Sequence, residues 1–220
     1  MISVLIVDDQ DLVREGLRML LDAEPDLSVA GEAGNGSQAL AQVRRLDPDV
    51  VLMDVRMPEM DGVEATAKLV RDGCRARILM LTTFNLDEYV YRAMKAGASG
   101  FLLKDASREQ LAGAVRTVST GHALLAPAIT RRLIDDFCRG PAPGVAAASA
   151  AGGLSGRELE VMRLVAEGLS NAEIATKLYL GETTIKSHVA RVLAKLSLRD
   201  RVQIVVFAYE NGIVRPGCGA

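Results

Sequence analysis

Three aspartates stand where short apolar runs end. Asp8 and Asp9 follow the run at residues 2–7, and Asp54 closes the run that begins at residue 49. Any one of them has an ordinary alternative role as a loop acid or a helix cap. Carboxylates gathered in one crevice repel one another unless a cation lies among them. Because oxygen ligands in a wet site suit Mg²⁺, the three aspartates together predict a magnesium site.

Two further polar residues follow apolar runs. Thr82 comes after the run at 77–81, and Lys104 comes after the run at 100–103. A lysine beside carboxylates and Mg²⁺ provides a fixed positive charge for an anion, and a threonine hydroxyl can donate a hydrogen bond to a phosphoryl oxygen. Phosphoryl transfer depends mainly on such positioning and charge. The five residues therefore predict a site that accepts a phosphoryl group.

The elements that must position these residues alternate along the chain. Short apolar runs predict strands at 2–7, 27–33, 49–53, 77–81 and 100–103, and helical spacing predicts helices at 10–23, 37–46, 62–70, 87–96 and 109–118. This alternation predicts an α/β fold with a five-stranded parallel, doubly wound sheet. Ligands of such sheets bind beyond the carboxyl ends of the strands, where all five polar residues fall.

The rest of the chain has a different pattern. A helix is predicted at about 128–138, and residues 139–153, which are mostly small and include two prolines, predict a flexible linker. Four helices without strands follow at 154–167, 171–178, 183–196 and 201–209. We therefore predict a first domain at 1–122, a linker helix and flexible linker at 123–153, and an all-α four-helix domain at 154–220.

The bulk composition excludes several protein classes. The 220 residues are 49% hydrophobic and 25% charged, which is ordinary for a globular protein. The three cysteines are far apart, which fits neither a disulfide framework nor a metal cluster. We expect a cytoplasmic protein, because no secretory signal and no membrane-spanning apolar run is apparent. The segment from residue 153 onward contains nine basic and seven acidic residues and is therefore mildly basic, whereas the whole chain has a net charge of −2.

Four segments of the first domain carry a family resemblance. Asp8-Asp9, MDVRMPEMDG from residue 53, LTTF from residue 81 and GASGFLLKD from residue 97 resemble the receiver domain of two-component response regulators, over about residues 1–120. The resemblance implies that Asp54 accepts the phosphoryl group and that Asp8, Asp9, Asp54 and the backbone carbonyl of Arg56 hold Mg²⁺. It also implies that Lys104 pairs with the phosphoryl group, with Thr82 as the switch hydroxyl and Phe101 as the switch aromatic.

The sequence departs from this family at two positions. Many receivers have proline, with a cis peptide bond, after the lysine, whereas this chain has Asp105. A cis bond without proline costs about 2.5–4 kcal/mol, so the geometry of the Lys104–Asp105 peptide stays open. The switch aromatic is Phe101 rather than tyrosine, which removes any hydroxyl contact.

A phosphatase is the main enzymatic alternative for the first domain. Haloacid-dehalogenase-type phosphatases also use an aspartate nucleophile at a strand end with Mg²⁺, and they place a second aspartate two residues later as general acid. That position is Arg56 here, so turnover would lack its acid. We therefore predict that the protein is not an enzyme.

The all-α domain contains a pattern typical of DNA binding. Two short helices with a tight break at residues 180–182 predict a helix-turn-helix. Ser155 precedes Glu158 at the spacing of a capping box, and Ser170 is a second predicted cap. The outer side of the third helix is mostly polar or basic, which suits a DNA major groove, although a solvated helix face has the same pattern. Its candidate DNA contacts are Thr183, Thr184, Lys186, Ser187, His188, Arg191 and Lys195.

The segment from Leu154 to about Arg201 closely resembles the helix-turn-helix of the LuxR/NarL family. The matching stretches are LSGRELEVM, GLSNAEIA and TTIKSHVARVLAKL, in that order. Lys186 is the best candidate for a base contact by this resemblance. The last helix carries an apolar stripe of Val202, Val205, Val206 and Tyr209. Spacing alone leaves open whether this stripe packs on its own domain or forms a two-fold dimer contact, and the resemblance favours the dimer.

These observations predict a DNA-binding transcriptional response regulator. The resemblance implies that a partner sensor histidine kinase phosphorylates Asp54 with Mg²⁺ and that the protein then binds double-stranded DNA as a homodimer. The alternative is a DNA-binding regulator whose first domain is an interaction module insensitive to phosphorylation. The complete set of acidic, hydroxyl and lysine residues argues against that alternative.

Overall fold

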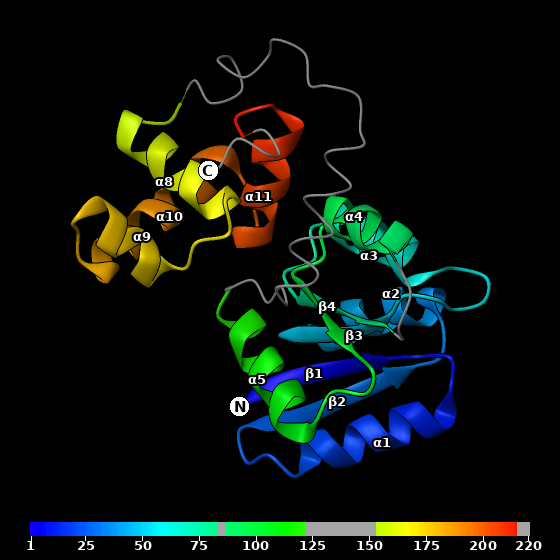
Figure 1. Ribbon diagram of the computed structural model, residues 1–220. Helices are drawn as coiled ribbons and strands as arrows, with labels where there is room; N and C mark the ends of the chain where they lie inside the picture. The colour runs from blue at the N-terminus through cyan, green and yellow to red at the C-terminus, as the bar shows by residue number, and fades with distance from the viewer. Residues whose placement is uncertain (83–86, 122–152, 215–220) are drawn as a thin grey trace. The chain divides into compact units, whose positions relative to one another are not determined.

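The computed structural model describes residues 1–82, 87–121 and 153–214 (Figure 1). The chain divides into two compact units, residues 1–129 and residues 130–220. The predicted helix at 128–138 lies outside the described residues, as does the predicted linker apart from Gly153. No helix in the described ranges has the length and apolar character needed to cross a membrane.

The first unit is built on a five-stranded parallel sheet, as predicted. Its strands are β1 (Ile2–Val7), β2 (Leu27–Ala33), β3 (Val50–Asp54), β4 (Arg77–Thr82) and β5 (Gly100–Leu103), in the spatial order β2-β1-β3-β4-β5. The buried runs of β1, β3 and β4 are almost continuous, because helices cover both faces of the sheet. The predicted strand limits agree with the structure to within one residue at each end.

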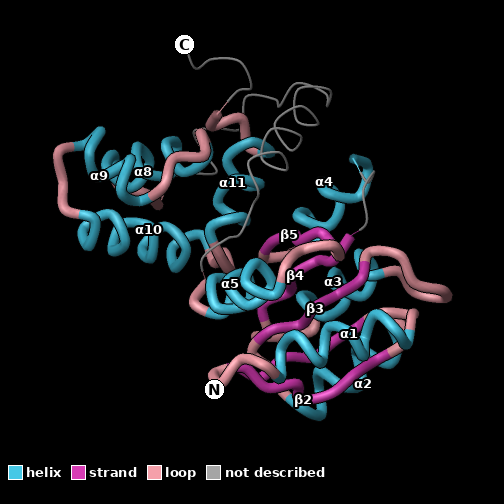
Figure 2. The backbone as a smooth tube through the Cα atoms, turned by 60° about the horizontal axis from the view of Figure 1, so that its bottom comes forward, coloured by secondary structure: helices cyan, strands magenta, loops and turns pink. Residues whose placement is uncertain are grey.

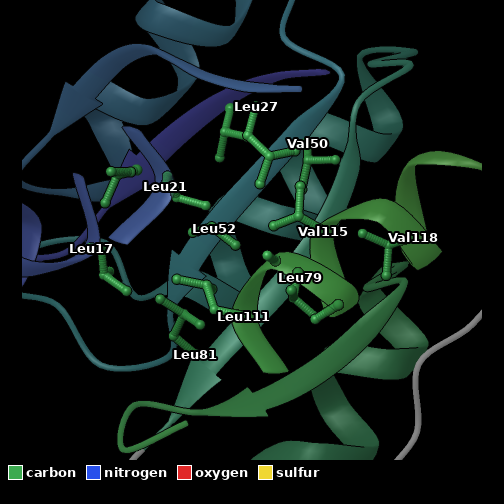
Figure 3. Packing of buried hydrophobic residues seen from close by; sticks show 14 residues of the cluster. Leu17, Leu21, Leu27, Val50, Leu52, Leu79, Leu81, Leu111, Val115 and Val118 are labelled. Carbon is green, nitrogen blue, oxygen red and sulfur yellow. The ribbon is translucent and has the colours of Figure 1, made fainter. Parts of the chain in front are cut away.

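Five helices alternate with these strands: α1 (Asp11–Asp22), α2 (Gly36–Leu46), α3 (Gly62–Arg71), α4 (Asp87–Ala96) and α5 (Arg108–Ser119). Helices α1 and α5 lie on one face of the sheet, and α2, α3 and α4 lie on the other (Figures 1 and 2). The core under α1 and α5 is aliphatic (Figure 3). It joins Leu17 and Leu21 of α1 and Leu111 and Val115 of α5 to leucines and valines of the sheet.

The second unit is helical, with α8 (Gly156–Ala166), α9 (Asn171–Leu178), α10 (Glu182–Leu196) and α11 (Arg201–Glu210). Both predicted caps are present: Ser155 forms a capping box with Glu158, and Ser170 forms one with Glu173. Helix α9 ends at Tyr179, which has a left-handed φ of 54°. This tight end turns the chain into α10 and completes the helix-turn-helix.

Candidate phosphoacceptor site and nucleic-acid interface

The sheet register brings the predicted site residues of the first unit to one edge. Val7 pairs with Met53, so Asp8 and Asp54 follow on neighbouring strands. Thr82 pairs with Leu103, so Lys104 follows directly beside it, and the Lys104 amide donates to the Thr82 carbonyl at 2.8 Å. The parallel topology thus gathers residues that are up to 96 positions apart.

The acidic cluster lies at this edge. Asp8, Asp9 and Asp54 each offer one carboxylate oxygen, and these oxygens lie within 4.8 Å of one another. Asp8 and Asp54 are buried, whereas Asp9 is exposed. Burial, together with repulsion from Asp8, raises the pKa of Asp54 from 3.8 to about 6. A set of three carboxylates in which Asp54 resists ionisation fits a hard divalent cation such as Mg²⁺.

Lys104 lies between the two buried carboxylates. Its Nζ is 2.6 Å from Oδ2 of Asp8 and 3.0 Å from Oδ1 of Asp54, and its side chain is 13% exposed. Burial acts to lower the pKa of Lys104, but the two carboxylates outweigh that effect and raise it. The lysine therefore stays charged. No cis peptide bond occurs among the described residues, so the Lys104–Asp105 peptide is trans.

A close backbone approach shapes the loop behind Asp54. The Val55 amide donates to the Leu81 carbonyl, and the Gly62 amide donates back to the Val55 carbonyl at 3.0 Å. A Cβ atom on Gly62 would lie 1.9 Å from the carbonyl oxygen of Asp54. Only glycine fits there. This constraint was not predicted, because the sequence pattern shows Gly62 only as the first residue of the predicted helix at 62–70. Asp61 does cap α3, where its side chain accepts from the Glu64 amide.

The predicted switch residues lie on one face of the sheet. Phe101 pairs with Met80, and Met80 and Thr82 share a strand face because they are two residues apart. Phe101 is 1% exposed and Thr82 is 5% exposed. The ring of the predicted switch aromatic therefore lies inside the domain in this structure. The Arg56 side chain is exposed.

The candidate DNA-contacting surface lies along α10. Ile185 and Val192 face the interior of the domain and are fully buried. The other side of the helix exposes Thr183, Thr184, Lys186, Ser187 and Arg191. Lys186 is half-exposed, with its Nζ 3.2 Å from Oε1 of Glu182 one turn earlier. The exposed candidates thus share one helical surface with polar and positive groups available to a partner.

Two other candidates have side-chain atoms directed toward the rest of the domain. The Nζ of Lys195 lies 2.7 Å from Oε2 of Glu158, which is buried and which also accepts from the Ser155 amide. These contacts lower the pKa of Glu158 to about 2, with the lysine as the largest cause. His188 is half-buried, and its Nδ1 atom lies inside the domain with no hydrogen-bond partner among the described residues. The structure therefore gives Lys195 a role in joining α10 to α8.

The proposed dimer residues are interior residues in this structure. Val202, Val205, Val206 and Tyr209 are at most 6% exposed, because α11 packs on α8 and α10. Spacing left open whether this stripe packs on its own domain or on a second copy. In the structure, α11 packs on its own domain. These four side chains offer almost no surface to a second copy, so a dimer interface formed by them does not fit this packing.

Comparisons with known proteins match both units of the chain. The family model described as "Response regulator receiver domain" matches residues 4–116, and the model described as "Bacterial regulatory proteins, luxR family" matches residues 153–208. The first match spans the sheet and the acidic cluster. The second spans α8, α9 and α10 and most of α11.

Relatives match almost the whole chain. "Uncharacterized transcriptional regulatory protein YxjL" of Bacillus subtilis is 42% identical over 97% of this chain and 98% of its own length. "Response regulator protein VraR" of Staphylococcus aureus is 37% identical over 97% of this chain and 99% of its own length. The solved structure of the response regulator ChrA from a heme-sensing two-component system covers 97% of this chain and 98% of its own, with 33% identity and a TM-score of 0.53. The chain therefore belongs to the two-component response regulators of the LuxR/NarL family, with a receiver domain and a LuxR-type DNA-binding domain.

Proposed function

We propose that this response regulator is switched by phosphorylation of Asp54 and that Mg²⁺ is required for the transfer. A sensor histidine kinase supplies the phosphoryl group, and the modified protein binds double-stranded DNA as a homodimer in the cytoplasm. The observation that carries the proposal is the position of Lys104, with its Nζ 2.6 Å from Asp8 and 3.0 Å from Asp54. A buried cation held by two carboxylates is arranged to receive a new anion on one of them.

Asp8, Asp9 and Asp54, with the Arg56 carbonyl, would hold the Mg²⁺ ion, which when bound neutralises charge on the transferring group. A carboxylate oxygen of Asp54 attacks the phosphorus atom, and the bond from phosphorus to the donor breaks with its electron pair leaving on the donor. Lys104 then moves its charge from the carboxylates to the phosphoryl oxygens, and the Thr82 hydroxyl donates a hydrogen bond to one of them. Phe101, on the same sheet face as Thr82, repacks around it. Phosphorylation thus acts as a local change of charge that biases a two-state packing.

For the second domain we propose that α10 enters the major groove. Lys186 and Arg191 contact phosphates or base edges, and Thr183, Thr184 and Ser187 are further contacts. Two weaker candidates are Lys195, which pairs with Glu158, and His188, whose Nδ1 atom is buried. Because the stripe on α11 is buried, a homodimer would use other residues.

The direct test incubates the purified protein with Mg²⁺ and acetyl phosphate, followed by mass measurement and DNA-binding titration. We expect one phosphoryl group per chain, none after EDTA treatment, and none in Asp54→Asn. The matched control is Asp105→Asn, which makes the same change at an exposed aspartate next to Lys104 and leaves phosphorylation intact. A phosphoryl group on Asp54→Asn would overturn the site. Phosphorylation without any change in DNA affinity would favour the phosphorylation-independent regulator.

A further inference from the structure

Arg14 of helix α1 contacts two residues outside its own helix. Its Nη1 donates to the backbone carbonyl of Asp8 at 2.7 Å, and its Nε lies 3.3 Å from Oε2 of Glu32 on β2. Its third partner is the carboxylate of Asp11 in the same helix. The side chain is only 16% exposed. The guanidinium therefore joins the end of β1 to β2 and to the first turn of α1.

This contact adds to the hydrogen bonds that Asp8 makes within the domain. The Asp8 amide donates to the Ala33 carbonyl at 3.1 Å, and Oδ1 accepts from the Gln10 amide at 3.0 Å. Oδ2 faces Lys104 at 2.6 Å. The remaining polar group is the carbonyl oxygen, which Arg14 holds. The amide, Oδ1 and the carbonyl of Asp8 are thus hydrogen-bonded within the domain, whereas Oδ2 has only its ion pair with Lys104.

The Asp8 carbonyl belongs to the planar peptide that joins Asp8 to Asp9. A hydrogen bond to that oxygen fixes the plane of the peptide and hence the direction in which Asp9 leaves the strand. The Asp9 side chain is exposed, and no hydrogen bond or ion pair holds it within the described ranges. The position of Asp9 relative to Asp8 and Asp54 therefore depends on its backbone.

We propose that Arg14 is a positioning residue for the Mg²⁺ site, acting through the Asp8–Asp9 peptide. The inference rests on the proposed function, since it concerns the same cation site. Ligands that are already in place lose less freedom when the ion binds. Outer groups that orient metal ligands are worth about 10–100-fold in metal affinity. We expect the Mg²⁺ dissociation constant of Arg14→Gln to rise by about tenfold.

The sign of this effect separates positioning from simple electrostatics. Removing a positive charge near a cation site strengthens cation binding if only Coulomb forces act. Loss of a positioning contact weakens binding instead. Arg18 provides the matched control, because it lies one turn further along α1 and its Nε is 2.6 Å from Oε1 of the same Glu32. None of its hydrogen bonds within the described residues reaches Asp8.

The experiment titrates Mg²⁺ into the metal-free full-length wild type, Arg14→Gln and Arg18→Gln by isothermal titration calorimetry, with no phosphodonor present. We expect weaker binding in Arg14→Gln only. Equal or tighter binding in Arg14→Gln than in Arg18→Gln overturns the inference. Arg14→Lys is measured in parallel, and it replaces Arg14→Gln in the comparison if Arg14→Gln does not fold. A compact ammonium cannot bridge the three partners of the guanidinium, so weakened binding is expected there as well, and unchanged binding would count against Arg14.

A second measurement follows acetyl phosphate transfer at saturating Mg²⁺. We expect Arg14→Gln to reach the wild-type rate there, because excess ion restores occupancy of the site. A rate that stays low at saturation places the defect outside ion binding and contradicts the inference. If the wild type binds Mg²⁺ but accepts no phosphoryl group, the proposed function fails while the comparison of dissociation constants still decides the role of Arg14.

Discussion

Replacing the phosphoacceptor by asparagine is expected to stabilise the metal-free receiver domain. Burial and the neighbouring Asp8 raise the pKa of Asp54 from 3.8 to about 6. One pKa unit corresponds to about 1.4 kcal/mol. With both states ionised at neutral pH, the charge on Asp54 therefore costs the fold on the order of 3 kcal/mol. Asp54→Asn removes that cost. In a domain of this size we expect the midpoint of unfolding to rise by about 10 °C.

The pH dependence follows from the direction of the shift. Because the pKa of Asp54 is higher in the folded state, the folded domain loses stability as the pH rises from the unfolded-state pKa of 3.8 toward about 6. The advantage of Asp54→Asn is therefore full above about pH 7 and vanishes below about pH 4. Added Mg²⁺ should stabilise the wild type much more than the variant, because a bound ion offsets the repulsion.

Differential scanning calorimetry of the full chain in EDTA at several pH values measures this effect, and the transition of the DNA-binding domain serves as an internal reference. Asp105→Asn, at an exposed position, controls for the substitution itself. Equal midpoints for wild type and Asp54→Asn at neutral pH would refute the view that the site is electrostatically strained without its cation. An advantage that persists at pH 3.5 would refute the assignment of the strain to the ionised form.

Three further predictions concern residues at the edges of the two sites. Lys186→Ala should weaken DNA binding and reduce the dependence of log affinity on log salt by about one, measured by fluorescence anisotropy at several salt concentrations. Lys195→Met should lower the unfolding midpoint of the helical domain above pH 4.5, with the difference fading as the pH falls toward 2 and Glu158 is protonated in both states. The salt dependence of DNA binding by Lys195→Met should equal that of the wild type. Gly62→Ala should destabilise the receiver domain by about 1–3 kcal/mol and slow phosphorylation, because the added methyl group displaces the Asp54 backbone.

The Lys186 and Gly62 predictions each have a control within the chain. Lys177→Ala removes an exposed charge from α9 and should leave the salt dependence nearly unchanged. Gly16→Ala adds a methyl group to open space on α1 and should stabilise the receiver by about 0.5–1 kcal/mol. A phosphorylation rate equal to wild type in Gly62→Ala would show that Asp54 tolerates a shifted backbone. If Lys195→Met reduces the dependence of log DNA affinity on log salt, Lys195 contacts DNA after all.

Local pattern was enough to predict most of the architecture. Continuous apolar runs identify the five strands, and apolar residues at helical spacing identify the helices, because each pattern reflects which faces are buried. A parallel doubly wound sheet then places every strand end at one edge, so Asp8, Asp54 and Lys104 could be grouped before any coordinate was known. The Ser155–Glu158 cap was likewise predictable, because its atoms are three residues apart.

Contacts between distant segments were decided only by the tertiary structure. An apolar stripe on α11 has the same spacing whether it meets α8 or a second copy, and only the packing shows that it is interior. Lys195 looks like a DNA-facing lysine by its position in the helix, but its partner Glu158 lies 37 residues away. The need for glycine at residue 62 and the hold of Arg14 on the Asp8 carbonyl are backbone contacts, and no side-chain pattern records them.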